Sequence, residues 1–520
     1  MGTVIQDRPQ INPGSQPRWD RFERTELFAQ YRELRTQGIS ERQAAKELKV
    51  PRTTLQAWRV WHDSLDRCPH VADFFQSGPG LAFLHRLVIA FHLVCIEVGA
   101  CGIRLGCLFL RLTGLDRFVA ASYGAQQQVN LHVEQAIVDY AQTETPRLAQ
   151  DMPHKDLTVT QDETFTGGLC LVTMDPESHC ILLEQLAQTR DQTSWNALMA
   201  PALAQLNCRV IQSTSDEAPG LLASVEHYLE AHHSPDLFHV QHELVKAVSG
   251  PLATKERAAH KAVTESREQI EQVQAHQQRA ADEPEKRGPG RPPKAPLSLE
   301  QAAQALEAAS REHERLARQR EQVKASIRAI GHDDHVVDLE RGVRRNGQLI
   351  ASDIHEHIEQ VRAIARHEGL SQSCLERIDK AERVVPKMQA TIEFVSGYVR
   401  QQVDQLHLRQ PESFAMHAKL IPSWYLDRVA RTRTLSEGEP LRELAERLRA
   451  PLFEPHGVLS ELSPEAQGRL HDEAKRLAAV FQRSSAHVEG RNGYLSLRNH
   501  QLRGLDLPRK RECFTAIHNF

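Results

Sequence analysis

Two short stretches decide the fold of this chain: LTVTQDETF at residues 157–165 and CRVIQSTSDEA at residues 208–218. Each begins with β-branched and apolar residues that favour a strand, and each runs into a polar turn at Asp162 or Asp216. A third acid, Glu489, lies far along the chain in a helix-like stretch, SSAHVEGRNGYLSLRNH. Acids from two strand ends and a helix, brought together by folding, would hold a pair of divalent metal ions.

The residues around these stretches predict an α/β core that begins at 151–245. LCLVTMD and CILLEQLAQ would form a three-stranded meander with the first stretch, and an amphipathic helix carrying Trp195 follows. CRVIQSTSD is the predicted fourth strand, LLASVEHYLEAHH a helix, and DLFHVQH at 236–242 the fifth strand. The order β-β-β-α-β-α-β predicts one mixed five-stranded sheet, with Asp236 interpreted as a turn or strand-start residue.

The bulk composition excludes several classes. At 520 residues the chain is too long for one compact core, so several domains are expected. Hydrophobic residues make up 40% and charged residues 25%, as in a soluble globular protein, and the net charge of −4 requires any nucleic-acid contact to come from local basic patches. The nine cysteines lack CxxC spacing and are interpreted as reduced core residues of a cytosolic protein. No phosphate-binding GxxxxGKS, GxSxG or signal peptide is found.

Residues 1–22 are polar and rich in Pro and Gln, which predicts a disordered lead-in, and residues 23–65 predict a compact helical domain. Gly38 would end its first helix, Ser40 would cap the next, and Pro51 would start the third. This spacing favours a DNA-binding helix-turn-helix over an ordinary helical hairpin with a solvated face. The residues expected to contact phosphates and base edges are Arg52, Thr53, Thr54 and Gln56.

Residues 66–150 predict a helical, apolar region that connects domains or forms a dimer. Its stretch Leu81–Leu115 looks membrane-like, but charged residues interrupt it, including Arg86, Glu97 and Arg104. No uninterrupted apolar run reaches the roughly 20 residues that a membrane span requires. Buried or dimer-forming helices are therefore favoured over a membrane segment.

Residues 246–480 predict a helical insertion with an antiparallel coiled coil. Apolar residues step by three and four from Leu299 to Ile330, interrupted by His313 and Arg320, and a fainter seam runs over 252–280. The tip between them, at 286–294, resembles an AT-hook, in which an extended basic segment lies in the minor groove. Its DNA contacts would be Arg287, Arg291 and Lys294, and the alternative is a charged flexible loop.

Other acids and histidines have weaker claims to the metal site. Glu163 and Glu217 would point to the opposite face of the sheet, and Glu243 is the rival third ligand. The clusters at 332–335 (HDDH) and 355–357 (HEH) lack zinc-site spacing and are interpreted as surface features. The glycines that flank Glu489, Gly490 and Gly493, predict a helix packed closely against a neighbour.

The acidic segments resemble the catalytic core of DDE-type transposases of bacterial insertion sequences. The resemblance is carried by TVTQDETF, IQSTSDEAPG, PDLFHVQHEL and SSAHVEGRNGYLSLRNH. It implies an RNase H-like α/β core interrupted by a large all-α, coiled-coil insertion, with an N-terminal helix-turn-helix domain and the second part of the core at 481–520. Asp162, Asp216 and Glu489 would be the catalytic residues and the ligands of two Mg²⁺ or Mn²⁺ ions.

The implied activity is hydrolysis at the ends of an insertion sequence, followed by transfer of the freed 3′-OH into target DNA. The implied partners are double-stranded DNA, at transposon ends and target, and a second copy of the chain in a homodimer or higher assembly. No membrane is involved, and the implied location is the bacterial cytoplasm, at the nucleoid. Similar transposases continue past RKRECFTAIHNF, where this chain stops at Phe520, so an inactive, C-terminally truncated enzyme is one expectation.

Three alternatives stay open. The chain could be a catalytically inactive, transposase-derived DNA-binding protein that uses only its helix-turn-helix and hook. It could also be a nuclease of the same fold that cuts without joining ends. A purely structural coiled-coil protein would account for the middle of the chain but not for the acid-bearing strands.

Overall fold

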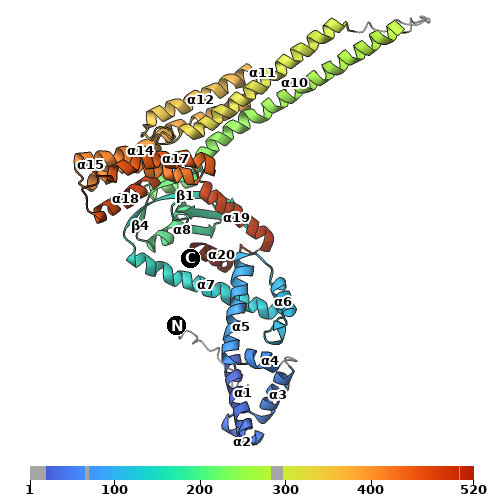
Figure 1. Ribbon diagram of the computed structural model, residues 1–520, viewed down its shortest axis with the longest axis vertical. Coiled ribbons are helices and arrows are strands. Elements are labelled where there is room, and N and C mark those ends of the chain that lie inside the picture. The colour runs from blue at the N-terminus through green and yellow to red at the C-terminus, as the bar shows by residue number, and fades with distance from the viewer. Residues whose placement is uncertain (1–18, 65–68, 283–296, 503) are drawn as a thin grey trace. The chain divides into compact units, whose positions relative to one another are not determined.

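The computed structural model describes residues 19–64, 69–282, 297–502 and 504–520 (Figure 1). Most of these residues are helical, and one five-stranded mixed sheet interrupts the helices, as the α/β core with a helical insertion predicts. The chain divides into two compact units, residues 1–147 with 495–520, and residues 148–494. The division falls within helix α19, Ala486–Leu502, so the predicted segment 481–520 contributes to both units.

The sheet has the strand order β3-β2-β1-β4-β5. The first three strands pair antiparallel as a meander, β4 runs parallel to β1, and β5 runs parallel to β4. The mixed five-stranded sheet is thus confirmed. Its strands are β1 (Lys155–Phe165), β2 (Leu169–Met174), β3 (Ile181–Leu186), β4 (Cys208–Ser215) and β5 (His232–Pro235).

Two helices, α8 (Gln192–Ala204) and α9 (Pro219–His227), pack on the sheet. Their buried side chains join those of the strands in one apolar core, which includes Trp195, Met199, Leu221, Leu157 and Val210. Fully burying side chains of this size stabilises a fold by about 1.5–3 kcal/mol each. The core fixes the sheet from which the acidic residues project.

The position of the fifth strand differs from the prediction. The strand lies at His232–Pro235, and the predicted strand DLFHVQH instead begins the long helix α10 at Leu237. Asp236 stands between them, and its carboxylate accepts a 2.8 Å hydrogen bond from the backbone N–H of Phe238, which satisfies one of the free donors at the helix start. The apolar residues of the stretch recur at helical spacing, with Leu237, Val240 and Leu244 buried.

Helices α10 (Leu237–Asp282) and α11 (Leu299–Asp333) form a long antiparallel hairpin (Figure 1). The two polar interruptions of the heptad seam have partners across the hairpin. Arg320 pairs with Glu256 over 2.6 Å, and the ring of His313 lies 5.2 Å from that of His260. Pairs of this kind fix the register of two long helices. The tip residues Arg287, Arg291 and Lys294 lie outside the described residues.

The rest of the insertion packs around one large core that also takes in the start of α10. The sequence predicts a single helix over Gln372–Asp404, but the structure divides it after Glu382, because Pro386 cannot continue the preceding helix. The helices of this region are α12 (Gly347–His367), α13 (Gln372–Glu382), α14 (Val385–Gln405), α15 (Gln410–Ala415), the π-helix η3 (Met416–Leu420), α16 (Ile421–Arg431), α17 (Leu435–Phe453) and α18 (Pro464–Ala479).

The first unit opens with three short helices, α1 (Arg21–Thr36), α2 (Glu41–Glu47) and α3 (Arg52–Asp63). Gly38 ends α1 with a φ of 82°, Ser40 caps α2 by accepting a hydrogen bond from the N–H of Gln43, and Pro51 precedes α3, each as predicted. The small side chain of Ala44 allows close packing. A compact core results, formed by Phe28, Tyr31, Ala44, Val50 and Leu55.

The predicted apolar region is helical and has its own core. Among the described residues, one helical stretch, Gly78–Val98, is long and apolar enough to cross a membrane by length and composition alone. It contains buried His92 and Glu97, both hydrogen-bonded to Asn130. The elements of this region are α4 (Pro69–Phe75), α5 (Gly78–Phe91), the π-helix η1 (His92–Val98), α6 (Ile103–Leu112), the 3-10 helix η2 (Leu115–Arg117) and α7 (Tyr123–Asp151). Helix α20 (Pro508–Asn519) belongs to the same compact unit.

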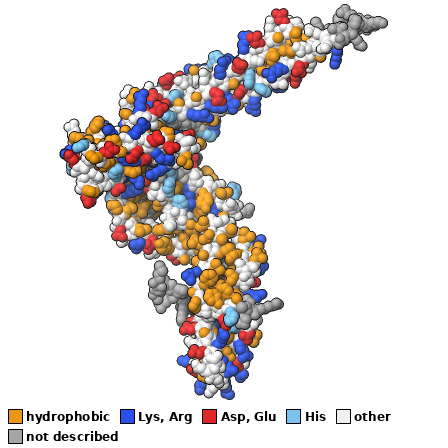
Figure 2. All heavy atoms as spheres, in the orientation of Figure 1, with side chains coloured by type: hydrophobic (Ala, Val, Ile, Leu, Met, Phe, Trp, Pro, Cys, Tyr) orange, Lys and Arg blue, Asp and Glu red, His pale blue; other side chains and the backbone are white. Residues whose placement is uncertain are grey.

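Hydrophobic side chains also gather on the surface over α5 and α6 (Figure 2). The exposed ones include Phe83, Ile89, Val94, Leu105 and Leu112. A contiguous exposed apolar patch is typical of an interaction surface. The role of this region in dimerisation stays a prediction.

Candidate metal centre

The pairing of β1 with β4 sets Asp162 beside Asp216. The parallel register pairs Thr158 with Gln212 and Thr160 with Thr214. Two residues further along each strand, the same register places Asp162 opposite Asp216. Neighbouring strands lie about 4.8 Å apart, so side chains at matched positions on one face are neighbours. Both aspartates are half-buried. Asp216 directly follows β4, as predicted, but the polar turn predicted at Asp162 is wrong, because β1 continues to Phe165 and Asp162 pairs with Val172 of β2.

Helix α19 brings Glu489 to the same end of the sheet. Asn492 follows Glu489 by three residues, which places both side chains on one face of the helix. The Nδ2 of Asn492 donates a 2.7 Å hydrogen bond to the Oδ2 of Asp162. The negative charges of Asp216 and Glu489 both act on Asp162, so the structure brings the three predicted acids together.

The pKa of Asp162 reflects this crowding. Its pKa is raised to about 6, mainly by burial and also by the charges of Asp216 and Glu489, against two hydrogen bonds that lower it. Those bonds come from the backbone N–H of Glu163, at 2.8 Å, and from Asn492. A half-buried carboxylate beside two others is costly without a counter-charge, which a divalent cation would supply.

Asp236 is a fourth acid at this site, and the sequence analysis missed it. Its side chain is fully buried, and its Oδ2 accepts a 2.5 Å hydrogen bond from the hydroxyl of Ser485. Ser485 also lies 3.2 Å from Oε1 of Glu489. One ligand atom from each of Asp236, His239 and Glu489 lies within 4.8 Å of the others. The missed signal was HHSPD, a short strand followed directly by an acid, as in the other two strand-end motifs.

The donor set fits a hard divalent cation. Mg²⁺ and Mn²⁺ prefer carboxylate and amide oxygens, and the site offers four carboxylates from different elements. The Oδ1 of Asn492 is also buried there, and no hydrogen-bond partner for it lies among the described residues. An orphaned carbonyl oxygen beside Asp162 suits a metal ion or a metal-bound water. The residues that would hold metal are Asp162, Asp216 and Glu489, with Asp236 added by the structure.

The weaker acidic candidates have basic partners instead. Glu163 accepts a 3.0 Å hydrogen bond from Arg190, and Glu217 pairs with Lys387. The rival third ligand, Glu243, lies within α10 and pairs with two cations of α13, Arg377 at 2.8 Å and Lys380 at 3.3 Å. These partners neutralise the three glutamates, which leaves the cluster at the strand ends as the candidate centre.

A buried ion pair holds α19 against the sheet. Arg491 donates two hydrogen bonds to Glu184 of β3, at 2.6 and 2.9 Å, and both side chains are almost completely buried. Removing one partner of such a pair costs about 3–5 kcal/mol, because the other charge is left buried alone. This pair and the Asn492–Asp162 hydrogen bond fix the face of α19 that carries Glu489.

Two predictions about nearby residues are wrong. Gly490 and Gly493 do not mark close packing, because a side chain at either position would meet nothing within 4 Å. The cluster at 332–335 is not a surface feature throughout, because Asp334 and His335 are buried. A ring nitrogen of His335 lies 2.7 Å from the hydroxyl of Tyr425, so the two buried polar groups form a hydrogen bond inside the insertion.

The predicted DNA-binding residues of α3 lie at its exposed start, but two of them are engaged. Arg52 and Gln56 both donate to the carboxylate of Glu41 on α2, at 3.1 and 2.8 Å. Thr53 is exposed and Thr54 is half-buried. Arg52 and Gln56 therefore share one face of α3, beside an acid that the sequence analysis did not consider.

Comparison with known proteins adds one finding. A model for a family of unknown function, DUF6399, matches residues 416–520. This segment contains Glu489 and Asn492, whereas Asp162 and Asp216 precede it. No curated protein and no solved structure matches the chain.

Proposed function

We propose that this protein is a DDE-type transposase with an RNase H-like core, which cuts DNA at insertion-sequence ends and transfers the strands into target DNA. The observation that carries the proposal is the convergence of Asp162, Asp216 and Glu489 at one end of a mixed sheet. The antiparallel meander followed by two parallel strands agrees with an RNase H-like core. The helical block between β5 and α19 agrees with the insertion that the resemblance implies.

The carboxylates would hold two Mg²⁺ or Mn²⁺ ions, which stabilise the attacking and leaving oxygens of a phosphodiester exchange. Asp162 and Asp216 provide ligands from rigid neighbouring strands. Glu489 closes the site from a helix, and its position depends on Asn492 and the buried Arg491. Because the ligands come from packed elements, their carboxylates need little reorganisation when ions bind.

DNA would be contacted outside the centre by local basic groups. The three short helices α1 to α3 support a helix-turn-helix domain with Arg52, Thr53, Thr54 and Gln56 facing the duplex. Arg287, Arg291 and Lys294 at the hairpin tip are proposed minor-groove contacts. The exposed apolar surface over α5 and α6 supports assembly as a homodimer or larger complex on DNA, and the proposed location is the bacterial cytoplasm, at the nucleoid.

The test is Mg²⁺- or Mn²⁺-dependent cleavage of DNA that carries the ends of the element. Asp216→Asn and Glu489→Gln are expected to lower the cleavage rate by more than about a hundredfold and to leave DNA binding intact. Glu217→Gln is the matched control, because its side chain adjoins Asp216 in sequence but pairs with Lys387. Equal cleavage by Glu489→Gln and the wild type would refute the assignment of the third ligand.

A catalytically inactive DNA-binding relative is the second candidate, and it is favoured by the α1 to α3 domain, whose core does not depend on the acids. Thermal unfolding with Mn²⁺ separates the two. A ligand at a hundred times its Kd stabilises the folded state by about 2.7 kcal/mol, so an Mn²⁺-dependent rise in Tm that Asp162→Asn removes favours the enzyme. DNA binding without that rise favours the inactive relative, and cleavage without joined products favours a nuclease.

A further inference from the structure

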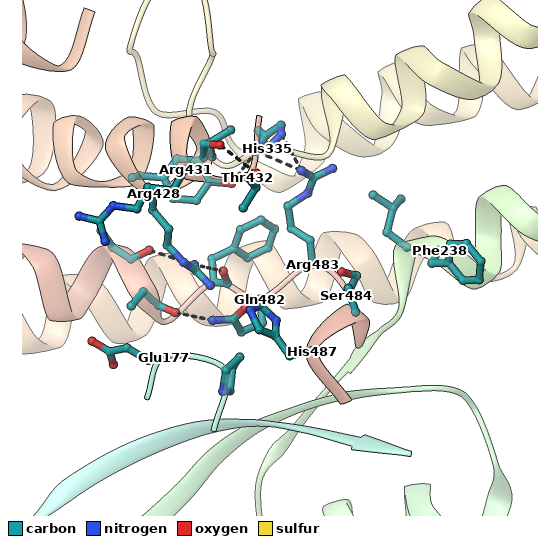
Figure 3. Close-up of a pocket in the computed structure, with 18 of the residues that line it drawn as sticks. Glu177, Phe238, His335, Arg428, Arg431, Thr432, Gln482, Arg483, Ser484 and His487 are labelled. Atoms are coloured by element: carbon teal, nitrogen blue, oxygen red, sulfur yellow. Dashed lines mark hydrogen bonds between the residues drawn. The ribbon is translucent and has the colours of Figure 1, made fainter. Parts of the chain in front are cut away.

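A cavity of about 580 Å³ adjoins the candidate metal centre (Figure 3). Glu489 lies in its wall, and the other walls come from the turn between β2 and β3, the start of α10, helix α16 and the segment that joins α18 to α19. The volume is in the range of sites that bind small molecules. A strand of DNA that reaches the carboxylates would therefore pass directly beside this cavity.

The cavity is rich in positive charge. Four cationic side chains line it, Arg428, Arg431, Lys475 and Arg483, against the two carboxylates of Glu177 and Glu489. Arg483 is matched by buried Asp334 at 3.4 Å. Within the described residues, the other three cations make no ion pair.

Arg428 is the central group of the three. Its Nη1 donates to the backbone carbonyl oxygens of Phe481, at 2.8 Å, and Ala478, at 3.5 Å. Burial removes part of the guanidinium of Arg428 from water and lowers its pKa. The charge of Glu177 acts on Arg428, but within the described residues no carboxylate lies at ion-pair distance from it. A partly desolvated guanidinium without a bound carboxylate can bind a phosphate in a fork geometry.

An aromatic ring at the same cavity points to a nucleotide rather than a bare anion. Phe238, at the start of α10, lines the cavity and is 49% exposed, although large apolar side chains are usually buried. Phe238 lies apart from Arg428 in the cavity (Figure 3), and its ring stacks on that of His242 with the centroids 5.5 Å apart. A cavity that offers both an exposed ring and cations can bind single-stranded nucleic acid, with bases stacked on the ring and phosphates on the cations.

We propose that this cavity binds a short stretch of a single DNA strand next to the bond that is cut, with one of its phosphates on Arg428 and one of its bases on Phe238. The proposal rests on the proposed function and deepens it, since it names the form in which DNA enters the site. Arg431, which is exposed, and Lys475 would draw the strand in from the rim. The strand must then be unpaired at this position, because a paired base could not stack on a protein ring.

The experiment measures binding of a fluorescently labelled hexathymidylate to the full chain in EDTA, by anisotropy over a range of salt concentrations. Arg428→Gln is expected to weaken binding at least fivefold and to reduce the slope of log K against log salt by about 0.7, the loss of one phosphate contact on a single strand. Phe238→Ala is expected to weaken binding at least fivefold with an unchanged slope. Arg447→Gln, an exposed arginine on α17, is the control and should stay within twofold of the wild type.

Arg431→Gln is a second variant for the case in which Arg428→Gln misfolds, because the side chain of Arg431 is exposed. Arg431→Gln should weaken binding of the oligonucleotide about twofold to threefold. Wild-type affinity in both arginine variants would overturn the proposal. Loss of binding in Arg428→Gln with no effect of Phe238→Ala, and displacement of the oligonucleotide by inorganic phosphate, would overturn the nucleotide assignment in favour of a simple anion site.

The binding assay contains no divalent metal, so it separates this proposal from the proposed function. Glu489-dependent cleavage together with normal oligonucleotide binding by Arg428→Gln would overturn the cavity assignment and leave the transposase proposal standing. Binding that depends on Arg428 and Phe238 in a protein that never cleaves DNA would support the cavity assignment and count against the enzyme.

Discussion

Asn492 on α19 donates a 2.7 Å hydrogen bond to Asp162 on β1, across 330 positions of sequence. The contact joins the parts of the chain that lie before and after the helical insertion. The two ends of the insertion also meet, because the N–H of Leu237 donates to the carbonyl oxygen of Arg483 over 3.0 Å. The insertion thus leaves the sheet and returns to it at the same place. Helix α19 can therefore reach the acidic residues of the sheet although more than 200 residues of insertion precede it.

Asn492→Ala tests the role of this hydrogen bond in positioning. Removing the amide leaves Asp162 without one of its two donors and frees the face of α19 that carries Glu489. Partners of metal ligands typically contribute a factor of about 10 to 100 in metal affinity, so Mn²⁺ affinity is expected to fall by about tenfold. Isothermal titration calorimetry with Mn²⁺ measures the change directly.

The control is Asn499→Ala on the same helix, a half-buried asparagine whose side chain makes no hydrogen bond within the described residues. This variant should bind Mn²⁺ as the wild type does. Equal Mn²⁺ affinity in Asn492→Ala and the wild type would show that Asn492 does not position the site.

Ser485→Ala tests whether Asp236 and Glu489 act together. The Ser485 hydroxyl donates to Asp236 and lies within hydrogen-bond distance of Glu489, so it fixes one acid relative to the other. Its removal leaves a buried carboxylate oxygen without a partner, which costs about 1–3 kcal/mol of stability, and the cleavage rate is expected to fall by about tenfold. Ser484→Ala, one position earlier, is the control. A variant that loses stability without losing rate would limit Ser485 to a structural role.

The sequence was sufficient to predict the sheet because its strands have strong local signals. Apolar and β-branched residues mark the first half of β1 and most of β4, and the meander needs only short loops. Asp162 and Asp216 could be paired for the same reason, since both close a strand pattern. The antiparallel hairpin followed from heptads long enough to be recognised without knowledge of their partner.

The features that the sequence did not predict depend on contacts between distant segments. β5 is four residues long and contains two histidines and a proline, so its pattern was weaker than that of the apolar helix after it. Because the fifth strand was predicted in the wrong place, Asp236 was not recognised as an acid at a strand end. The hydrogen bonds from Arg52 and Gln56 to Glu41 form only when α2 packs against α3. His335 is buried by contact with Tyr425 of α16, which lies 90 residues later in the sequence.

Glu41→Gln tests whether that acid restrains DNA binding by α3. Its carboxylate accepts hydrogen bonds from Gln56, Tyr31, Arg52 and Arg59. The bonds from Gln56, Tyr31 and Arg52, together with the charge of Arg59, lower the pKa of Glu41 to about 2. Removing the negative charge frees the neighbouring arginines to bind phosphates, so the non-specific affinity for duplex DNA is expected to rise severalfold.

Arg52→Ala should lower the affinity for duplex DNA and reduce the slope of log K against log salt by about 0.9. Electrophoretic mobility shifts at several salt concentrations measure both, and unchanged affinity in both variants would place the DNA surface elsewhere.

His232 on β5 predicts a loss of stability in mild acid. Burial lowers the pKa of His232 from its usual 6.5 to about 4, and the ring stacks on Phe394 at 4.6 Å. Between these pH values the unfolded chain binds a proton that the folded chain does not, so stability falls as the pH drops from about 6.5 towards 4. The loss of stability from this group is about 1–2 kcal/mol, allowing for partial solvent access.

Thermal unfolding at pH 7.5 and 5.0 measures this loss of stability. It should be smaller in His232→Gln than in the wild type or in the control His500→Gln, which removes an exposed histidine. Equal losses in all three would refute the assignment.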